Sequence, residues 1–402
     1  MKLLLTKDEE QRLLDFKHDM HIHPELPHQE YETTKKIKAF LETIPGVEIL
    51  ELDPELTGVV ARIRGRKENA ESCDAPTSIT EVGLRADIDA IAQTETWDGP
   101  YRSQNPGVMH ACGHDFHTAS LLGAAMLLSK YADEWSGTVD LLFQEAEETT
   151  DGAKEMLDAG LFDLIHPQMF FGMHNRPEVE AGKVVCHTGG LMACKTNFHI
   201  TINGLGGHGG NPHLCVDPIV CAAAIIQSLQ TIVSRNTNPL ESVVMTVGSI
   251  HAGSVENVVA DQVKMTASIR ALSEDAKAKA VSRMEEIVYG TAKAYGCQVE
   301  IEYREILPLV YNSPQMCALA KRAAIDAVGE ENVTDAEPTM ASEDFSLIMA
   351  RVPSFFFWVG SGTPGETPYA WHSENFHTDD SAIRAAALTM AQAALHALEE
   401  NV

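Results

Sequence analysis

The feature that most constrains the fold of this chain is a repeated pattern. A short apolar run is followed by a cluster of ionisable side chains and then, in most cases, by a helical stretch. Continuous apolar runs of this length are typical of strands buried on both faces of a largely parallel sheet. The pattern therefore predicts an α/β fold whose mixed, largely parallel sheet is flanked by helices. The four runs are EVGLRA (81–86), GTVDLLFQ (137–144), QMFFGM (168–173) and PSFFFWVG (353–360).

The ionisable side chains that follow these runs are candidates for a functional site. In open α/β sheets, ligands bind beyond the carboxyl ends of the strands, and each cluster falls at such an end. Core packing does not explain this repeated placement, so we expect the clusters to converge. Their members, in chain order, are Asp87, Asp89, Glu145, Glu147, Glu148, His174 and His372.

A different pattern occupies residues 196–305. Strand-like and helical segments alternate there in the order β-α-β-β-α-β, which is the order of the ferredoxin-like unit. We therefore expect an inserted α+β domain over 196–305. The first domain would then consist of 1–195 and 306–402, and the ionisable clusters belong to it.

The stretch GVMHACGHDFHTA (107–119) holds a thiol and several imidazoles where a strand-like region gives way to a helix. Gly113 permits a tight turn, so the side chains of Cys112 and His114 can point the same way. Together with the carboxylates and histidines after the strands, they form a set of metal-ligand types. The set is too large for one closed tetrahedral site, but it suits two divalent ions about 3.5–4 Å apart.

A second interpretation of this stretch stays open. Cys112 is a possible nucleophile with His114 or His117 as its base, although that leaves the glutamates and the distant histidines without a role. His117 and Asp87 are each expected either to support the site or to be structural. The two histidines of HIHPE (21–25) are expected to be structural.

The glutamate pair after the second run suggests a division of labour. If the segment is extended, Glu147 and Glu148 point in opposite directions, so one can bind metal while the other faces a water molecule. A carboxylate beside an activated water is a natural general base.

Several motifs, in this order along the chain, resemble one metallopeptidase family. That family includes aminoacylases, hippurate hydrolases, N-acetyldiaminopimelate deacetylases and indole-acetyl-amino-acid amidohydrolases. The resemblance spans HIHPELPHQE (21–30) to HSENF (372–376), and the cysteine of ACGHD is similar to the amidohydrolase branch. The motifs are GLRADIDA, GVMHACGHDFHTA, LLFQEAEE, GMHN, GGHGGNPH, SEDFS and HSENF.

The resemblance implies a zinc-exopeptidase-like domain that binds two divalent ions per subunit, with Zn, Mn, Co and Ni all compatible with the ligand types. Glu147 would be the general base, and Asp89 would orient a metal-binding side chain. The implied metal ligands are Cys112, His114, Glu148, His174 and His372.

The resemblance also implies that the inserted domain is a lid through which the chain forms a homodimer. His208 would reach the site of a neighbouring subunit and polarise the scissile carbonyl. Asn257 and Arg270 would hold the α-carboxylate of the substrate. The expected reaction is hydrolysis of the amide bond of N-acyl amino acids with acetyl, benzoyl or other aryl-acyl groups.

Three alternatives to this reaction remain: a dipeptidase or carboxypeptidase of the same family, a non-catalytic ligand-binding protein and a thiol hydrolase. The sequence departs from the family at QEAEE, DAIAQTE and ENVVADQ, which leaves the substrate preference open but removes none of the implied ligands.

Charge and composition limit the classes of partner that we expect for this chain. The formal net charge of −28 repels phosphate backbones and anionic lipid, so we expect neither nucleic-acid nor membrane partners. No apolar run in the sequence looks long enough to span a bilayer, and the N-terminus lacks a signal-like apolar core. The eight scattered cysteines suggest reduced thiols, and we expect a cytoplasmic protein.

Overall fold

The computed structural model describes residues 1–67 and 79–400. They form two compact units: unit 1 comprises Met1–Gly189, Tyr311–Glu337 and Leu347–Val402, and unit 2 comprises Gly190–Val310 and Pro338–Ser346. The sequence pattern predicts domain boundaries at 195/196 and 305/306, whereas the contacts within the structure place them at 189/190 and 310/311. The contacts also place 338–346 with unit 2.

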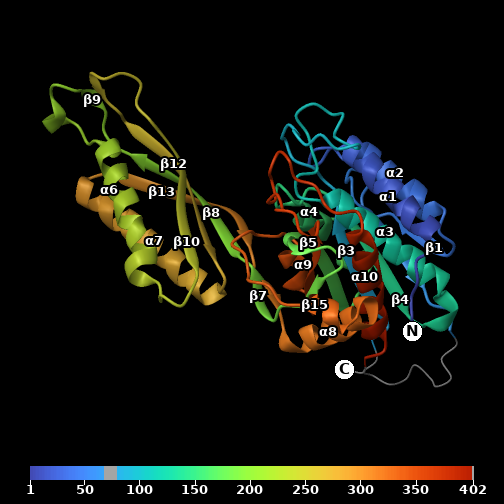
Figure 1. Ribbon diagram of the computed structural model, residues 1–402. Helices are drawn as coiled ribbons and strands as arrows, with labels where there is room; N and C mark the ends of the chain where they lie inside the picture. The colour runs from blue at the N-terminus through green and yellow to red at the C-terminus, as the bar shows by residue number, and fades with distance from the viewer. Residues whose placement is uncertain (68–78, 401–402) are drawn as a thin grey trace. The chain divides into compact units, whose positions relative to one another are not determined.

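Unit 1 is built on an eight-stranded sheet (Figure 1). Its central strands β4, β3, β5 and β16 are parallel neighbours, while β1, β2 and β6 pair antiparallel. The predicted mixed, largely parallel sheet is thereby confirmed. In sheet order the strands are β1 (Val47–Leu50), β2 (Val59–Arg64), β4 (Thr138–Gln144), β3 (Glu81–Asp87), β5 (Met169–Glu180), β16 (Ser354–Gly362), β6 (Val184–Val185) and β15 (Val333–Thr334).

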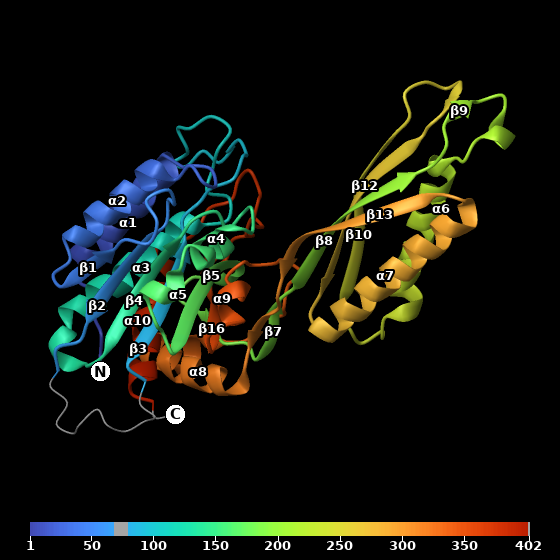
Figure 2. The same cartoon turned by 180° about the vertical axis from the view of Figure 1, so that it is seen from behind.

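Helices lie on both sides of this sheet, as Figures 1 and 2 show. The first begins with a capping box, in which the Thr6 hydroxyl accepts the N–H of Glu9 and the Glu9 carboxylate accepts that of Thr6. The helices of unit 1 are α1 (Lys7–Ile22), α2 (Tyr31–Glu42), α3 (His114–Lys130), α4 (Gly152–Asp158), α5 (Leu161–Leu164), α8 (Pro314–Val328) and α10 (Ala382–Leu398); α9 (Ser346–Met349) begins at the last residue of unit 2.

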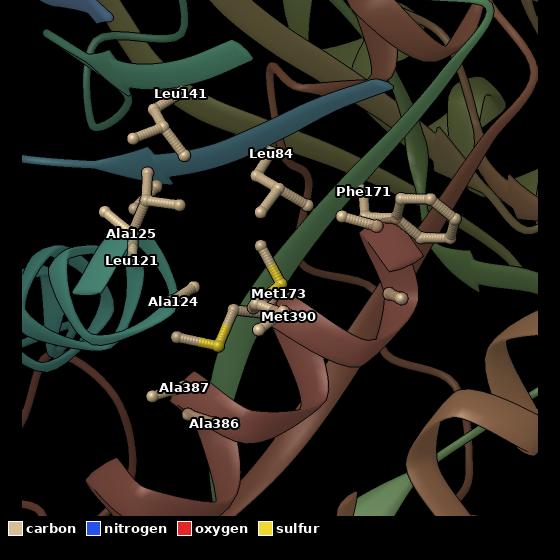
Figure 3. Close-up of a cluster of buried hydrophobic side chains, with 14 of the residues drawn as sticks. Leu84, Leu121, Ala124, Ala125, Leu141, Phe171, Met173, Ala386, Ala387 and Met390 are labelled. Carbon is tan, nitrogen blue, oxygen red and sulfur yellow. The ribbon is translucent and has the colours of Figure 1, made fainter. Parts of the chain in front are cut away.

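The core of unit 1 depends on close packing of α3 and α10. Their small residues meet strands β3, β4 and β5 in one apolar cluster (Figure 3). A Cβ at Gly123 would lie 2.7 Å from the Cβ of Ala387, so a larger residue there would push the helices apart. Helix α3 is buried almost throughout, and its first residue, His114, is fully buried as well.

Unit 2 has the predicted β-α-β-β-α-β order, and its sheet runs β10-β12-β8-β13 with every pair antiparallel. Helices α6 and α7 cover one face (Figure 1), which confirms the ferredoxin-like fold. Its elements are β8 (Cys194–Asn203), β9 (Gly207–His208), α6 (Pro218–Thr231), β10 (Val243–Ala252), β11 (Val258–Val259), β12 (Gln262–Ala271), α7 (Glu274–Tyr295) and β13 (Gln298–Leu307). Two short strands cross the unit boundaries along the chain: β7 (Gly189–Met192) begins at the last residue of the first segment of unit 1, and β14 (Val310–Asn312) ends in unit 1.

One helical stretch corrects an expectation from the sequence. Pro218–Asn236 is long and apolar enough, by length and composition alone, to cross a membrane. Within unit 2, Cys221, Ile225 and Leu229 of this stretch are fully buried in the core, so it packs as a core helix on one face.

Seven cysteines in the described residues are free thiols, and Cys73 lies outside those residues.

Candidate metal centre

The structure brings all five implied metal ligands into one cluster of unit 1. Cys112, His114 and His174 have ligand atoms that lie within 4.8 Å of one another, and so do Cys112, Glu148 and His372. The Sγ atom of Cys112 is 3.3 Å from Nε2 of His174. On the other side, Nε2 of His372 is 3.3 Å from Oε2 of Glu148.

Gly113 places Cys112 and His114 as the sequence predicts. It has a φ of 85° and precedes α3, so the chain turns sharply between the thiol and the imidazole. A Cβ at Gly113 would lie 2.5 Å from Nδ2 of Asn175, so a side chain there would also collide with the neighbouring strand.

The glutamate pair differs from its predicted geometry. Residues 147–150 form a turn after β4, not an extended segment, and Ala146 before it has a left-handed φ of 51°. In this turn Glu147 and Glu148 each place an oxygen within the same 4.8 Å group as a nitrogen of His114. Both carboxylates therefore face the cluster, so one can act as a ligand and the other can act directly beside it.

The two histidines that are distant in the sequence, His174 and His372, join the cluster from a strand and from a loop, respectively. His174 lies within β5, opposite Trp358 of β16, and not in a loop after the strand as the sequence suggests. His372 lies in the loop after β16 with a left-handed φ of 63°, and its N–H donates to the Ala111 carbonyl over 2.8 Å. Its imidazole is 52% exposed, so this side of the cluster is open to solvent.

Asp89 contacts two of the implied ligands, His114 and Glu148. One carboxylate oxygen is 2.9 Å from Nδ1 of His114, and the other accepts the backbone N–H of Glu148 over 2.9 Å. Because Nδ1 of His114 is engaged there, Nε2 is the atom left to face the cluster.

Asp87 and His117, whose roles the sequence left open, pack against the cluster and against each other. Oδ1 of Asp87 is 2.6 Å from Nδ1 of His117, and Oδ2 accepts from the Arg85 guanidinium over 2.9 Å. All three side chains are fully buried. No sequence motif indicates that Arg85 is buried beside Asp87, a carboxylate of the same strand.

The charges in the cluster favour a bound cation. Burial opposes charge on His114, but Asp87, Asp89 and Glu148 outweigh it and raise the pKa of His114 to about 10. Burial and the nearby Glu148 and Glu147 raise the pKa of the Cys112 thiol well above its usual range. The buried carboxylates thus hold protons on neighbouring groups, which a metal ion would displace.

Two buried atoms without a hydrogen-bond partner indicate whether these residues suit a metal ion. Nε2 of His114 and Oε1 of Glu148 are buried and have no hydrogen-bond partner in the described part of the chain. Burying such atoms without a partner costs about 1–3 kcal/mol each, so their shared orientation needs an explanation. A cation between them supplies one, and their separation of 3.9 Å leaves room for it.

The same environment disfavours the thiol-nucleophile interpretation. A reactive cysteine needs a lowered pKa, whereas the pKa of Cys112 is raised. Burial, with His117 next, lowers the pKa of His174 well below its usual range, so the imidazole 3.3 Å from the thiol is a weak base.

The remaining implied residues belong to unit 2. His208 in β9 pairs with Val258 of β11, and Asn257 accepts the Gly209 N–H over 2.8 Å. Both side chains are exposed. Arg270 lies near the last residue of β12, and its guanidinium donates to the Met340 carbonyl over 2.8 Å.

Comparison with known proteins identifies relatives of the whole chain. Residues 83–396 match the model of peptidase family M20/M25/M40. The chain is 39% identical over 388 residues to the N-acetylcysteine deacetylase of Bacillus subtilis, covering 96% of this chain and 97% of that one. It is 34% identical to an N-acetyldiaminopimelate deacetylase of a Geobacillus species, covering 91% and 92%.

A solved structure is also similar to this chain over nearly its whole length. It is that of a Bacillus subtilis protein described as a dinuclear metal-binding peptidase of the M20 family. Its TM-score is 0.83 at 35% identity, with 98% of this chain and 99% of that one covered.

Proposed function

The chain belongs to peptidase family M20/M25/M40 and is an amide-bond hydrolase, and on this premise we propose that it removes the acyl group from N-acyl amino acids. The observation that carries the proposal is the convergence of Cys112, His114, Glu148, His174 and His372 in one partly open cluster. N-acetyl amino acids are the first substrates to test, because two relatives are named for their deacetylation.

The five clustered side chains would hold two divalent ions. Such ions, when bound, supply positive charge that lowers the pKa of water and polarises a carbonyl. The mixed thiol, imidazole and carboxylate donors suit Zn²⁺, Mn²⁺, Co²⁺ or Ni²⁺. Asp89 would keep His114 and Glu148 aligned by holding one side chain and one backbone N–H.

Glu147 is the proposed general base. Its carboxylate lies in the same group as His114 and Glu148, yet it is not needed to complete the five-ligand set. It would accept the proton of the attacking water at a carboxylate oxygen. It would then return that proton to the leaving amine nitrogen, because protonation makes the amine a better leaving group.

The positions of the proposed lid residues support a homodimer. His208 and Asn257 lie at the β9–β11 pair, which precedes β12, while Arg270 lies near the end of that ten-residue strand. A strand rises about 3.3 Å per residue, so roughly 25 Å separates the two groups in one chain. One small substrate could meet both groups only if they came from different copies.

An exposed apolar surface around His208 supports the same proposal. Val258, which pairs with His208 between β11 and β9, is 49% exposed. Leu214, which follows His208 closely in the chain, is 67% exposed. Exposed apolar side chains beside a proposed catalytic histidine support a protein–protein contact there. We assign this surface to a second copy of the chain.

The proposed cellular setting is the cytoplasm, with no nucleic-acid or membrane partner. The net charge and the free thiols support it. Cell fractionation with an antibody to the chain would test the location.

The function is tested by hydrolysis of N-acetylcysteine, N-benzoylglycine and an unblocked dipeptide, each with added Zn²⁺, Mn²⁺ or Co²⁺. The proposal expects amine release from the acylated substrates and its loss on chelation. Preference for the dipeptide would favour a peptidase. Chelator-resistant activity that thiol alkylation abolishes would favour a cysteine nucleophile.

A further inference from the structure

Three separate segments of unit 1 carry Cys112, His174 and His372, and their spacing decides whether they can share metal ions. One buried residue contacts all three segments: Asn175, which directly follows His174 in β5 and is fully buried. Asn175 is the last residue of the GMHN motif, in which only His174 has so far been given a role.

The carboxamide of Asn175 connects two of the segments to β5. Its Nδ2 donates to the carbonyl oxygen of Cys112 over 2.5 Å. Its Oδ1 accepts the indole N–H of Trp371, the neighbour of His372, over 3.2 Å. The hydroxyl of Ser361 donates to the same oxygen over 3.2 Å, which fixes the carboxamide orientation.

The backbone of Asn175 also orients two imidazoles. Nδ1 of His174 is 2.8 Å from the Asn175 carbonyl oxygen and must therefore donate to it, so Nε2 keeps a lone pair for the cluster. The Asn175 N–H donates to Nε2 of His117 over 2.8 Å. This places the His117 proton on Nδ1, where it faces Asp87.

Packing around Trp371 strengthens the connection to His372. The Trp371 ring meets the His174 imidazole edge-on, with centroids 4.8 Å apart. The Arg176 guanidinium lies 5.1 Å from the centroid of the same ring and 4.3 Å from that of Trp358. The loop before His372 is thus held to β5 by an edge-on aromatic contact and a cation–π contact as well as by the Asn175 hydrogen bond.

We propose that Asn175 is a positioning residue that sets the spacing of the Cys112, His174 and His372 segments and thereby the affinity of the metal centre. This inference rests on the proposed metal-dependent function. An alanine at 175 would release the Cys112 carbonyl and the Trp371 indole together. An aspartate would keep the acceptor for Trp371 but would set an oxygen against the Cys112 carbonyl.

Asn312 provides a matched control in the same unit. It is also a fully buried asparagine, and it donates to the Phe356 and His187 carbonyls and accepts the Phe356 N–H. None of these partners belongs to the metal cluster. Asn312→Ala should therefore lower stability about as much as Asn175→Ala without changing the metal centre.

The experiment titrates metal-free wild type, Asn175→Ala, Asn175→Asp and Asn312→Ala with Co²⁺, following the thiolate absorption band, bound stoichiometry and Tm. We expect Asn175→Ala and Asn175→Asp to bind at least one ion 10–100-fold more weakly and to shift the band. Asn312→Ala should keep the wild-type affinity and band. Trp371→Phe, which removes the indole N–H but keeps an aromatic ring beside His174, should give a smaller loss.

The outcomes separate the two proposals. If wild type fails to bind two ions, the proposed function fails. If wild type binds two ions and both Asn175 variants and Trp371→Phe match Asn312→Ala in affinity and spectrum, the positioning role of Asn175 is overturned while the function stands. Should Asn175→Ala not fold, Asn175→Asp and Trp371→Phe carry the same comparison.

Discussion

The Sγ atom of Cys112 lies 3.3 Å from Nε2 of His174, although 62 positions separate the two residues in the chain. One lies in the turn before α3 and the other within β5, so only the fold brings them together. Both are buried, and Glu148 approaches from a third segment. A thiol, an imidazole and a carboxylate in this arrangement form a metal-binding set more readily than a hydrolytic triad.

Replacing Cys112 by alanine should reduce metal binding and leave the fold intact. The residue is small, and its removal from a polar cluster opens little apolar space. Elemental analysis after dialysis should show fewer than the wild-type number of ions per chain. An unchanged metal content would remove Cys112 from the ligand set.

Glu147→Gln and Glu148→Gln should have opposite consequences, although the residues are neighbours. Loss of the general base should lower kcat by about 10²–10⁴-fold while metal content stays at the wild-type level. Loss of the ligand Glu148 should instead lower metal content. Measuring both quantities on both variants tests the assignment, and metal loss in Glu147→Gln with retention in Glu148→Gln would reverse the two roles.

Stability should fall at alkaline pH because of a buried histidine away from the ligands. His21 lies between Asp115 and Glu95; burial opposes its charge, but the two carboxylates raise its pKa to about 9. Its stabilisation is complete below about pH 6.5 and is lost as the pH rises through about 9. Urea unfolding of the metal-free protein should show a loss of up to about 3 kcal/mol across that window.

The control for this prediction is His21→Gln, which keeps hydrogen-bonding capacity but cannot titrate. It should be less stable than wild type at pH 6.5, and its stability should change less between pH 6.5 and 9.5. Parallel curves for the two proteins would assign the pH dependence to other groups.

Mixing two inactive variants tests the proposed role of His208 across subunits. His208→Ala and Glu147→Ala each remove one proposed catalytic group, so each homodimer should be nearly inactive. A mixed dimer would contain one complete site of two, so its activity should approach about half that of a wild-type dimer, and a randomly reassorted equal mixture should reach about a quarter of wild-type activity. Verified mixed dimers without recovery would show that both groups act within one chain.

Much of the fold could be predicted because burial determines which residue types a strand contains. Strands 81–87 and 138–144 are buried on both faces, so their runs lack polar alternation and identify a parallel sheet. The proposed ligands could be named because their residue types are rare beside such runs and their motifs resemble a family.

Other features of the site depend on contacts that local sequence does not encode. The turn that points Glu147 and Glu148 the same way requires a left-handed Ala146, a conformation that alanine rarely adopts. The contacts of Asn175 with Cys112 and Trp371 span 63 and 196 positions. An apolar helix such as α6 can only be recognised as a core helix once its partner strands are known.

Anomalous X-ray scattering from crystals grown with zinc would show whether the five clustered side chains bind metal. The proposed metal centre predicts two zinc peaks per chain, with Cys112, His114, Glu148, His174 and His372 as their protein ligands. Peaks located elsewhere, or a chain that hydrolyses N-acetylcysteine at full rate with these side chains bound to no metal, would contradict it.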